Sequence, residues 1–236
     1  MPERLLILNP GSTSTKAAVY DGTRPLFSRS IPHSNQDLAP FPTLNDQLDY
    51  RVALVRGLLA QERVDLSTLT AVVGRGGILP NIVAGGYQVN DALVDCLLHY
   101  PVFEHASNLG GVMALAFARP LVIPAYIYDA VTSDELLPEA RITGFKGVTR
   151  TSFCHVLNAR ATAHKYAESR GLAYKDMNLV VAHLGAASVS VPTATAESST
   201  RYPMTPAPSP PTAREAPTPS MWWTCATPAN TPRRRC

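Results

Sequence analysis

Three short apolar runs open the chain, and their spacing constrains the fold more than any other feature of the sequence. They occupy residues 5–8, 16–21 and 26–31, and Asp21-Gly22 between the last two is a typical hairpin turn. Runs of this length and separation indicate β-strands. The opening is therefore predicted to be an antiparallel meander.

Helical and strand patterns alternate after the meander. Residues 45–59 carry apolar side chains at helical spacing, and Asn90 is a plausible N-cap for a helix over 90–98. Further helices are expected over 108–118 and 152–169, the latter carrying His155 and His164, and buried strands over 69–73, 121–128 and 178–183. Alternation of this kind predicts an α/β domain with a mixed sheet.

The segment "NPGSTSTK", residues 9–16, lies between the first two predicted strands. Its glycine and hydroxyl residues expose backbone N–H groups and short donors that suit phosphate oxygens, and Lys16 adds a positive charge. The GxxxxGK[ST] spacing of a P-loop is absent. Residues of these types also favour turns that bind nothing, so composition alone leaves both interpretations open.

Charge and cysteine content restrict the class of protein. The net charge of +3 is too small and too scattered to indicate nucleic-acid binding. The four cysteines show no CxxC spacing, which favours free thiols. The N-terminal apolar run is too short for a signal peptide or a membrane span, so a cytoplasmic protein is expected.

Six segments between residues 4 and 185 together resemble butyrate kinases, of the acetate kinase family in the actin-like and sugar-kinase superfamily. They are "LLILNPGSTSTKAAVYD", "VVGRGGILP…GGYQVND", "HASNLGGVMA", "PAYIYDAVTSDELLPEARITG", "SFCHVLNARATAHKYA" and "NLVVAHLG". The resemblance implies a ribonuclease-H-like mixed-sheet domain. It also implies Mg²⁺-dependent, reversible transfer of the γ-phosphoryl group of ATP to butanoate or another short-chain acid, giving the acyl phosphate.

The resemblance also implies roles for single residues. Ser12, Ser14 and Lys16 are expected to face the phosphates, and Asn9 to face Mg²⁺ or its water shell. His183 and Gly185 match the second phosphate motif of the family.

Four further residues are expected on the substrate and metal side of the site. Arg75 is expected to pair with the substrate carboxylate, and Asp129, at a strand end, to hold Mg²⁺ through water. His105 and His155 are expected to donate to phosphoryl oxygens in the transition state. In this chain Cys154 lies directly before His155, where the family pattern has phenylalanine.

The chain departs from the family pattern after Gly185. Ten of its 21 prolines lie within residues 187–236, and the expected glycine-rich continuation is replaced by "AASVSVPTATAESS". A reading frame one base earlier can encode "GGISVGAHRHGRVIDALP", which resembles the family. We therefore expect an N-terminal kinase domain over 1–176, the first strand of a truncated second domain over 177–186, and a disordered, out-of-frame tail over 187–236.

Several functional interpretations follow from the sequence. The first is a butyrate kinase that takes ATP and a short-chain acid as small-molecule substrates, with homo-oligomers possible in full-length relatives. The others are an inactive truncated fragment, a kinase for branched or other short carboxylates, a sugar kinase or actin-like ATPase, and a proline-rich tail that recruits a partner.

Overall fold

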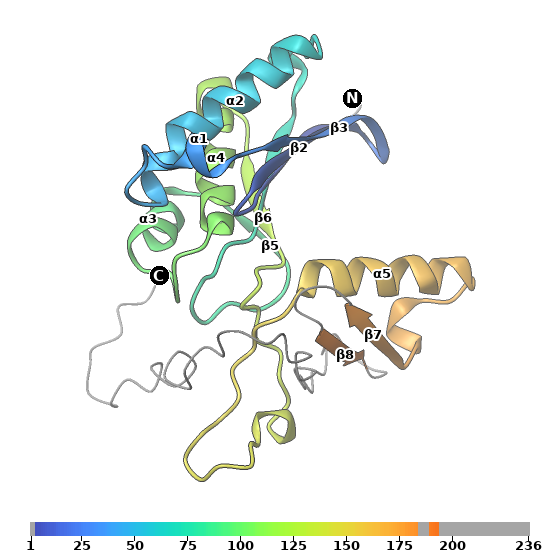
Figure 1. Ribbon diagram of the computed structural model, residues 1–236. Coiled ribbons are helices and arrows are strands. Elements are labelled where there is room, and N and C mark those ends of the chain that lie inside the picture. The colour runs from blue at the N-terminus through green and yellow to red at the C-terminus, as the bar shows by residue number, and fades with distance from the viewer. Residues whose placement is uncertain (1–2, 184–188, 194–236) are drawn as a thin grey trace.

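The computed structural model of the chain describes residues 3–183 and 189–193 (Figure 1). Its strands are β1 (Arg4–Pro10), β2 (Ser14–Asp21), β3 (Arg24–Pro32), β4 (Ala71–Arg75), β5 (Gly86–Gln88), β6 (Ala125–Tyr128), β7 (Leu179–His183) and β8 (Val189–Thr193). Its α-helices are α1 (Asn35–Leu38), α2 (Leu48–Gln61), α3 (Asp91–His99), α4 (Leu109–Ala118) and α5 (Val156–Ser169).

Six strands form one mixed sheet in the order β3-β2-β1-β4-β6-β5. β1, β2 and β3 pair antiparallel, which confirms the predicted meander, whereas β1, β4 and β6 run parallel. The short strand β5 pairs antiparallel with β6 at the far edge. The predicted α/β fold with a mixed sheet is confirmed.

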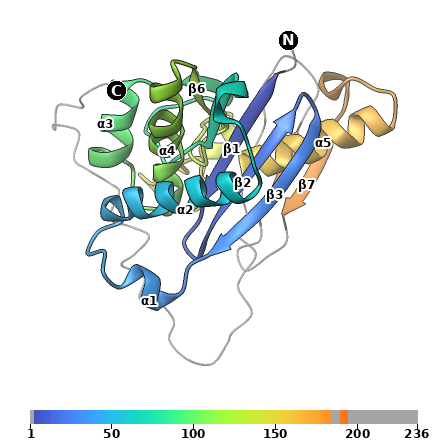
Figure 2. The same ribbon diagram turned by 90° about the horizontal axis from the view of Figure 1, so that it is seen from above.

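Helices α2, α3 and α4 cover one face of this sheet (Figure 2). The buried face of β1 contributes Leu6 and Leu8, and β2 contributes Ala17 and Val19. Because side chains alternate along a strand, this pattern assigns every second residue to the helix-covered core. The residues that alternate with them along β1, such as Ile7 and Asn9, belong to the other face.

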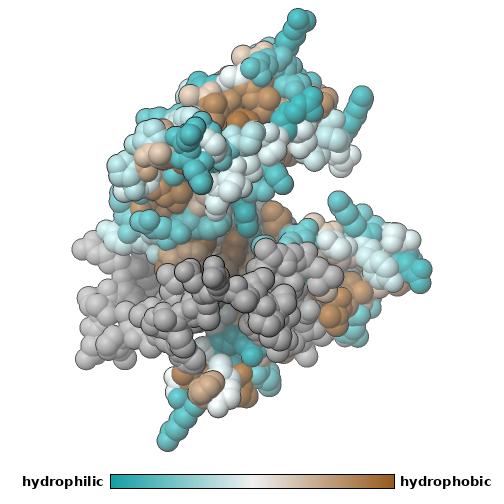
Figure 3. Space-filling model, viewed as in Figure 1, coloured by the Kyte–Doolittle hydropathy of each residue, from teal (hydrophilic) through white to brown (hydrophobic). Residues whose placement is uncertain are grey.

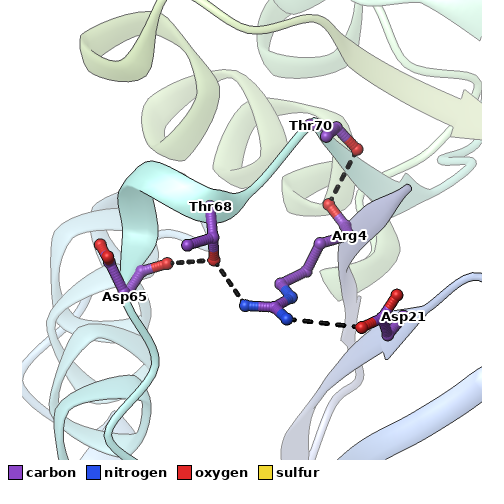
Figure 4. A network of polar contacts seen from close by, with 5 residues as sticks. All are labelled: Arg4, Asp21, Asp65, Thr68 and Thr70. Atoms are coloured by element: carbon purple, nitrogen blue, oxygen red, sulfur yellow. Dashed lines mark hydrogen bonds and ion pairs between the residues drawn. The ribbon is translucent and has the colours of Figure 1, made fainter. Parts of the chain in front are cut away.

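A polar network ties the start of the first strand to its neighbours (Figure 4). The guanidinium of Arg4 donates to Thr68 Oγ1 at 2.9 Å and forms an ion pair with Asp21 at 3.4 Å. Thr70 donates to the Arg4 carbonyl from both its backbone N–H and its hydroxyl. These contacts fix the register of β1 against β2 and β4 at the end opposite to the "NPGSTSTK" turn.

Two of the predicted elements that begin later than expected do so for a local reason. Pro120 opens a 3-10 turn over Arg119–Leu121, so β6 starts only at Ala125. The expected helix over 152–169 begins at Val156, because the Ser152 hydroxyl donates to the Ser133 carbonyl instead of capping a helix. His155 consequently lies directly before the helix and not on it.

A second, smaller packing unit forms around α5 and β7. Leu136, Cys154, Val156 and Ala159 form its buried cluster. β8 pairs antiparallel with β7, so residues 189–193 form a strand, which differs from the disorder expected from residue 187 onward. Backbone pairing accounts for the difference, because β8 satisfies hydrogen-bonding groups along one edge of β7. The rest of the expected tail lies outside the described residues.

Two findings concern the cysteines and the helix lengths. Cys154 is a buried thiol, in agreement with the expectation for that residue. Among residues 3–183 and 189–193, no helix combines the length and the apolar content needed to cross a bilayer.

Candidate functional site

The carboxyl ends of β1, β4 and β6 meet at one edge of the sheet. Leu8 pairs with Gly74, and Arg75 pairs with Tyr128. One residue beyond the first pair, Asn9 lies alongside Arg75, and Asp129 follows Tyr128. Three residues that are distant in sequence are therefore brought to the ends of adjacent strands, which are about 4.8 Å apart.

The predicted phosphate turn connects β1 and β2 at this edge. The Gly11 N–H donates to the Ser14 carbonyl at 2.7 Å, which closes a tight turn with Ser12 and Thr13 at its tip. Neither of these two residues donates its backbone N–H to any acceptor within the described part of the chain. Two N–H groups beside short hydroxyls form the kind of concave donor set that binds anions.

Strand register places the candidate side chains on one face of the sheet. Asn9 pairs with Lys16, and Ser14 lies two residues before Lys16, so these three share a face. Arg75 lies on that same face, because Val73 pairs with Ile7 two residues earlier in each strand. This is the face opposite to α2, α3 and α4. Space-filling atoms show the surface hollowed between the sheet and α5 (Figure 3).

Arg75 ends β4 half-buried, and it makes no hydrogen bond or ion pair with any side chain in residues 3–183. Burial lowers the pKa of its guanidinium, which nevertheless stays charged. Gly76 follows Arg75. A Cβ atom added to Gly76 would lie only 2.6 Å from the Ala130 backbone, so a side chain does not fit there. An unpaired, half-buried guanidinium of this kind is suited to a bound carboxylate or phosphate.

His105 precedes a 3-10 turn over Ala106–Asn108, and its neighbours fix its tautomer. The Ser107 N–H donates to His105 Nδ1 at 3.1 Å, so in the neutral ring Nε2 carries the proton. Burial and the charge of Arg75 both lower the pKa of His105. The ring is thus a neutral Nε2–H donor within the field of Arg75.

His155 stacks on His183, with ring centroids 4.0 Å apart and planes inclined by 17°. The Asn158 side chain, from the first turn of α5, contacts His183 Nδ1 at 2.9 Å. Burial, His183 and Arg75 all lower the pKa of His155. The structure therefore brings His105 and His155 within the field of Arg75 and stacks His183 on His155, whereas Gly185 lies outside the described residues.

Acidification is expected to destabilise the fold through these histidines. An unfolded chain takes up the proton of His155 near its ordinary pKa of 6.5, and the folded chain does so only at lower pH. Stability is therefore lost as pH falls below about 6.5 towards the lowered pKa of the folded state. Denaturant unfolding at pH 7 and pH 5 should show a smaller difference for His155→Gln than for the unaltered chain. An equal or larger difference in the His155→Gln variant would contradict the lowered pKa of His155 in the folded chain.

Asp129 directly follows β6 and adopts the left-handed region, with φ +43°, where Asp and Asn are tolerated better than most residues. Its side chain is only 1% exposed. Its Oδ1 accepts from the Gly85 N–H at 2.8 Å and lies 3.5 Å from Arg160 Nη1. Burial raises the pKa of Asp129 despite these two favourable contacts. The carboxylate is poorly hydrated and held rigidly at the sheet edge.

Glu135 adds a second carboxylate near Asp129. Its Oε2 is buried without a hydrogen-bond partner among the described residues, and its charge contributes to the raised pKa of Asp129. Two carboxylates that share little water fit a hard divalent cation, which takes one or two protein carboxylates and several waters. Among the described residues, no cluster of three or more His, Cys, Asp or Glu side chains could hold a metal. Asp129 and Glu135 would leave most coordination positions of a bound Mg²⁺ to water, which is the arrangement that this ion usually keeps.

Two buried residues outside the predicted site, Arg51 and His33, support the predicted phosphate turn. Arg51 of α2 contacts Gly11 and Thr15 from below, and His33 contacts Thr15. One signal was available: Arg51 falls on the apolar stripe of its helix, three residues after Leu48 and four before Val55. A charged residue at such a position indicates a buried polar contact.

Comparison with known proteins gives a consistent result. The chain is 42% identical over 182 residues to butyrate kinase 1 of Clostridium acetobutylicum, covering 77% of this chain and 51% of that protein. It is 40% identical over 185 residues to a probable butyrate kinase of Clostridium botulinum strain Eklund 17B, covering 78% and 52%. The chain is a homologue of butyrate kinases. It spans about half the length of the curated relatives it matches.

Two solved kinase structures share the fold of this chain. Acetate kinase of Porphyromonas gingivalis superposes with a TM-score of 0.56 at 14% identity, covering 80% of this chain and 54% of that one. A propionate kinase of Francisella tularensis superposes with a TM-score of 0.54 at 13% identity, covering 81% and 55%. No family model matches the chain. At such identities the structural likeness shows the fold alone, and it agrees with the predicted one.

Proposed function

We propose that this butyrate kinase homologue transfers the γ-phosphoryl group of ATP to the carboxylate of butanoate or another short-chain fatty acid, reversibly and with Mg²⁺. The observation that carries the proposal is the placement of Asn9, Ser14, Lys16 and Arg75 on one face of one sheet edge. The proposed location is the cytoplasm, where ATP is available. The domain limits expected from the sequence remain part of the proposal.

The reaction brings two anions together, so the site must lower their repulsion and hold attacker and leaving group in line. The turn at residues 11–14 offers free N–H groups and hydroxyls to the phosphates, and Lys16 adds charge on the same face. Arg75, unpaired among the described residues, holds the acid carboxylate. His105 offers its Nε2–H to the transferring phosphoryl oxygens, where negative charge develops.

Asp129 is the residue proposed to hold the metal, with Asn9 towards its water shell and Glu135 beside it. A bound Mg²⁺ supplies charge neutralisation between the phosphate oxygens. The protein contributes the poorly hydrated Asp129 carboxylate, held by the Gly85 N–H at the strand end. Arg160 partly balances this carboxylate at 3.5 Å, a distance long enough for it to be displaced by a stronger partner.

The proposal is tested by trapping the product. The full chain is incubated with ATP, Mg²⁺ and butanoate, and hydroxylamine converts any acyl phosphate to a hydroxamate that is measured by absorbance. We expect hydroxamate with butanoate, and none when glucose replaces the acid or when Mg²⁺ is chelated. Absence of hydroxamate above the level of the Asp129→Asn variant would contradict the proposal and favour a protein that binds phosphate without turnover.

A further inference from the structure

Arg51 is a fully buried arginine that none of the steps above uses. It lies in α2, on the helix-covered side of the sheet, directly beneath the phosphate turn. Its Nη1 donates to the Gly11 carbonyl at 3.0 Å and to Thr15 Oγ1 at 2.9 Å. Its Nε and Nη2 donate to Gln47 Oε1 at 3.1 Å and 2.9 Å. Every one of these acceptors is neutral.

The charge of Arg51 consequently has no carboxylate partner among the described residues. Burial lowers the pKa of its guanidinium, with only Tyr50 acting in the opposite direction, yet an arginine stays charged in proteins. Buried charges are normally paired, because an unpaired one loses its hydration without compensation. The fold thus keeps an uncompensated positive charge below a turn whose tip carries free N–H donors.

His33 completes the arrangement without adding charge. Its Nε2 lies 2.8 Å from Thr15 Oγ1, and its Nδ1 is buried without a partner in the described part of the chain. Burial and the charge of Arg51 lower the pKa of His33, and Asp37 acts in the opposite direction. A neutral His33 ring and the Arg51 donor together fix the Thr15 hydroxyl between them.

We propose that Arg51 is a positioning residue that shapes the 11–14 turn for a polyphosphate and whose missing counter-charge is the bound polyanion. The inference rests on the proposed function, because it assigns the same turn to the phosphates of the nucleotide. Arg51 holds the carbonyl of Gly11 away from the anion and leaves the N–H groups of Ser12 and Thr13 facing it. The bound polyanion then lies beside Lys16 on one face of the hairpin. The positive charge of Arg51 acts on it from the other face.

The test measures binding of inorganic tripolyphosphate to the full chain by calorimetry, at two salt concentrations. Arg51→Met keeps the length of the side chain and removes its charge and donors, so affinity is expected to fall about 10- to 100-fold. Arg51→Lys should recover part of the loss, because it keeps the charge but not the forked donor geometry. The Met variant should also show a weaker salt dependence, since one charge fewer is screened. Arg56→Met, an exposed position on the same helix, is the matched control and should bind as the unaltered chain does.

Each outcome decides the proposal. If Arg51→Met fails to fold, Thr15→Val replaces it, because this change removes the hydroxyl that Arg51 holds and should also weaken binding. Unchanged tripolyphosphate affinity in a folded variant would overturn the role of Arg51 and leave the proposed function standing. Equal losses of tripolyphosphate affinity in the Met and Lys variants, with unchanged salt dependence, would show that Arg51 has only a structural role and would overturn the proposal. Absence of binding by the unaltered chain would overturn both this inference and the proposed function.

Discussion

Replacing Gly74 with alanine is expected to destabilise the fold by about 3 kcal/mol or more. Gly74 lies in β4, where the first turn of α4 packs directly on the sheet. An added Cβ would overlap the Gly110 carbonyl and lie 2.9 Å from the Gly111 nitrogen. Both obstacles are backbone atoms, so no side chain can rotate away. Denaturant unfolding of the purified variant measures the loss.

Gly57→Ala provides the matched control for this prediction. Gly57 lies within α2 on an exposed position, and nothing would lie within 4 Å of its added Cβ. Alanine in a helix interior is better than glycine by about 0.5–1 kcal/mol, so this variant should be more stable than the unaltered chain. A Gly74→Ala variant with unchanged stability would show that α4 does not pack against β4 as described.

Replacing Asp129 with asparagine is expected to lower the rate of acyl phosphate formation about 100- to 1,000-fold while leaving the fold intact. Asparagine tolerates the left-handed backbone at φ +43° and its carbonyl oxygen can still accept from the Gly85 N–H. It carries no charge, so the proposed metal loses its main protein ligand. Steady-state kinetics of the hydroxamate reaction at saturating ATP measure the effect.

Stability should change in the opposite direction from activity in this variant. The pKa of Asp129 is raised in the folded chain, so the stability associated with this group is lost as pH rises above the unfolded-state pKa and through the folded-state pKa. Removing the ionisable group should therefore keep or raise the melting temperature at pH 7. Asp129→Ala, which has no oxygen for Gly85 and a less tolerated backbone, should be less stable than Asp129→Asn. Full activity in the Asp129→Asn variant would show that Asp129 is not part of the site.

Much of the sheet could be predicted from the sequence because its strands are continuous apolar runs. The meander of β1, β2 and β3 follows from such runs and from the turn at Asp21-Gly22. Asn90 was predicted as an N-cap, and its side chain does accept from the Leu93 N–H at 2.9 Å. In these places local chemistry and tertiary packing favour the same structure.

Other features depend on contacts that sequence patterns do not contain. β5 spans only three residues, Gly86–Gln88. It forms because the edge of β6 is available for backbone pairing. Ser152 suggested a helix start but is used in a tertiary hydrogen bond to Ser133. The candidate residues were found by resemblance, whereas their common face and the support from Arg51 became apparent only from strand register and burial.

A crystal structure of the full chain with Mg²⁺ and tripolyphosphate tests most directly whether the predicted residues form one site. The account predicts that phosphate oxygens lie within hydrogen-bond distance of the Ser12 and Thr13 N–H groups and of Lys16. It also predicts that Arg75 lies beside the terminal phosphate, free to hold an acid carboxylate, and that the metal is held at Asp129. Tripolyphosphate bound elsewhere, or Arg75 turned away into an ion pair with another part of the chain, would contradict the account.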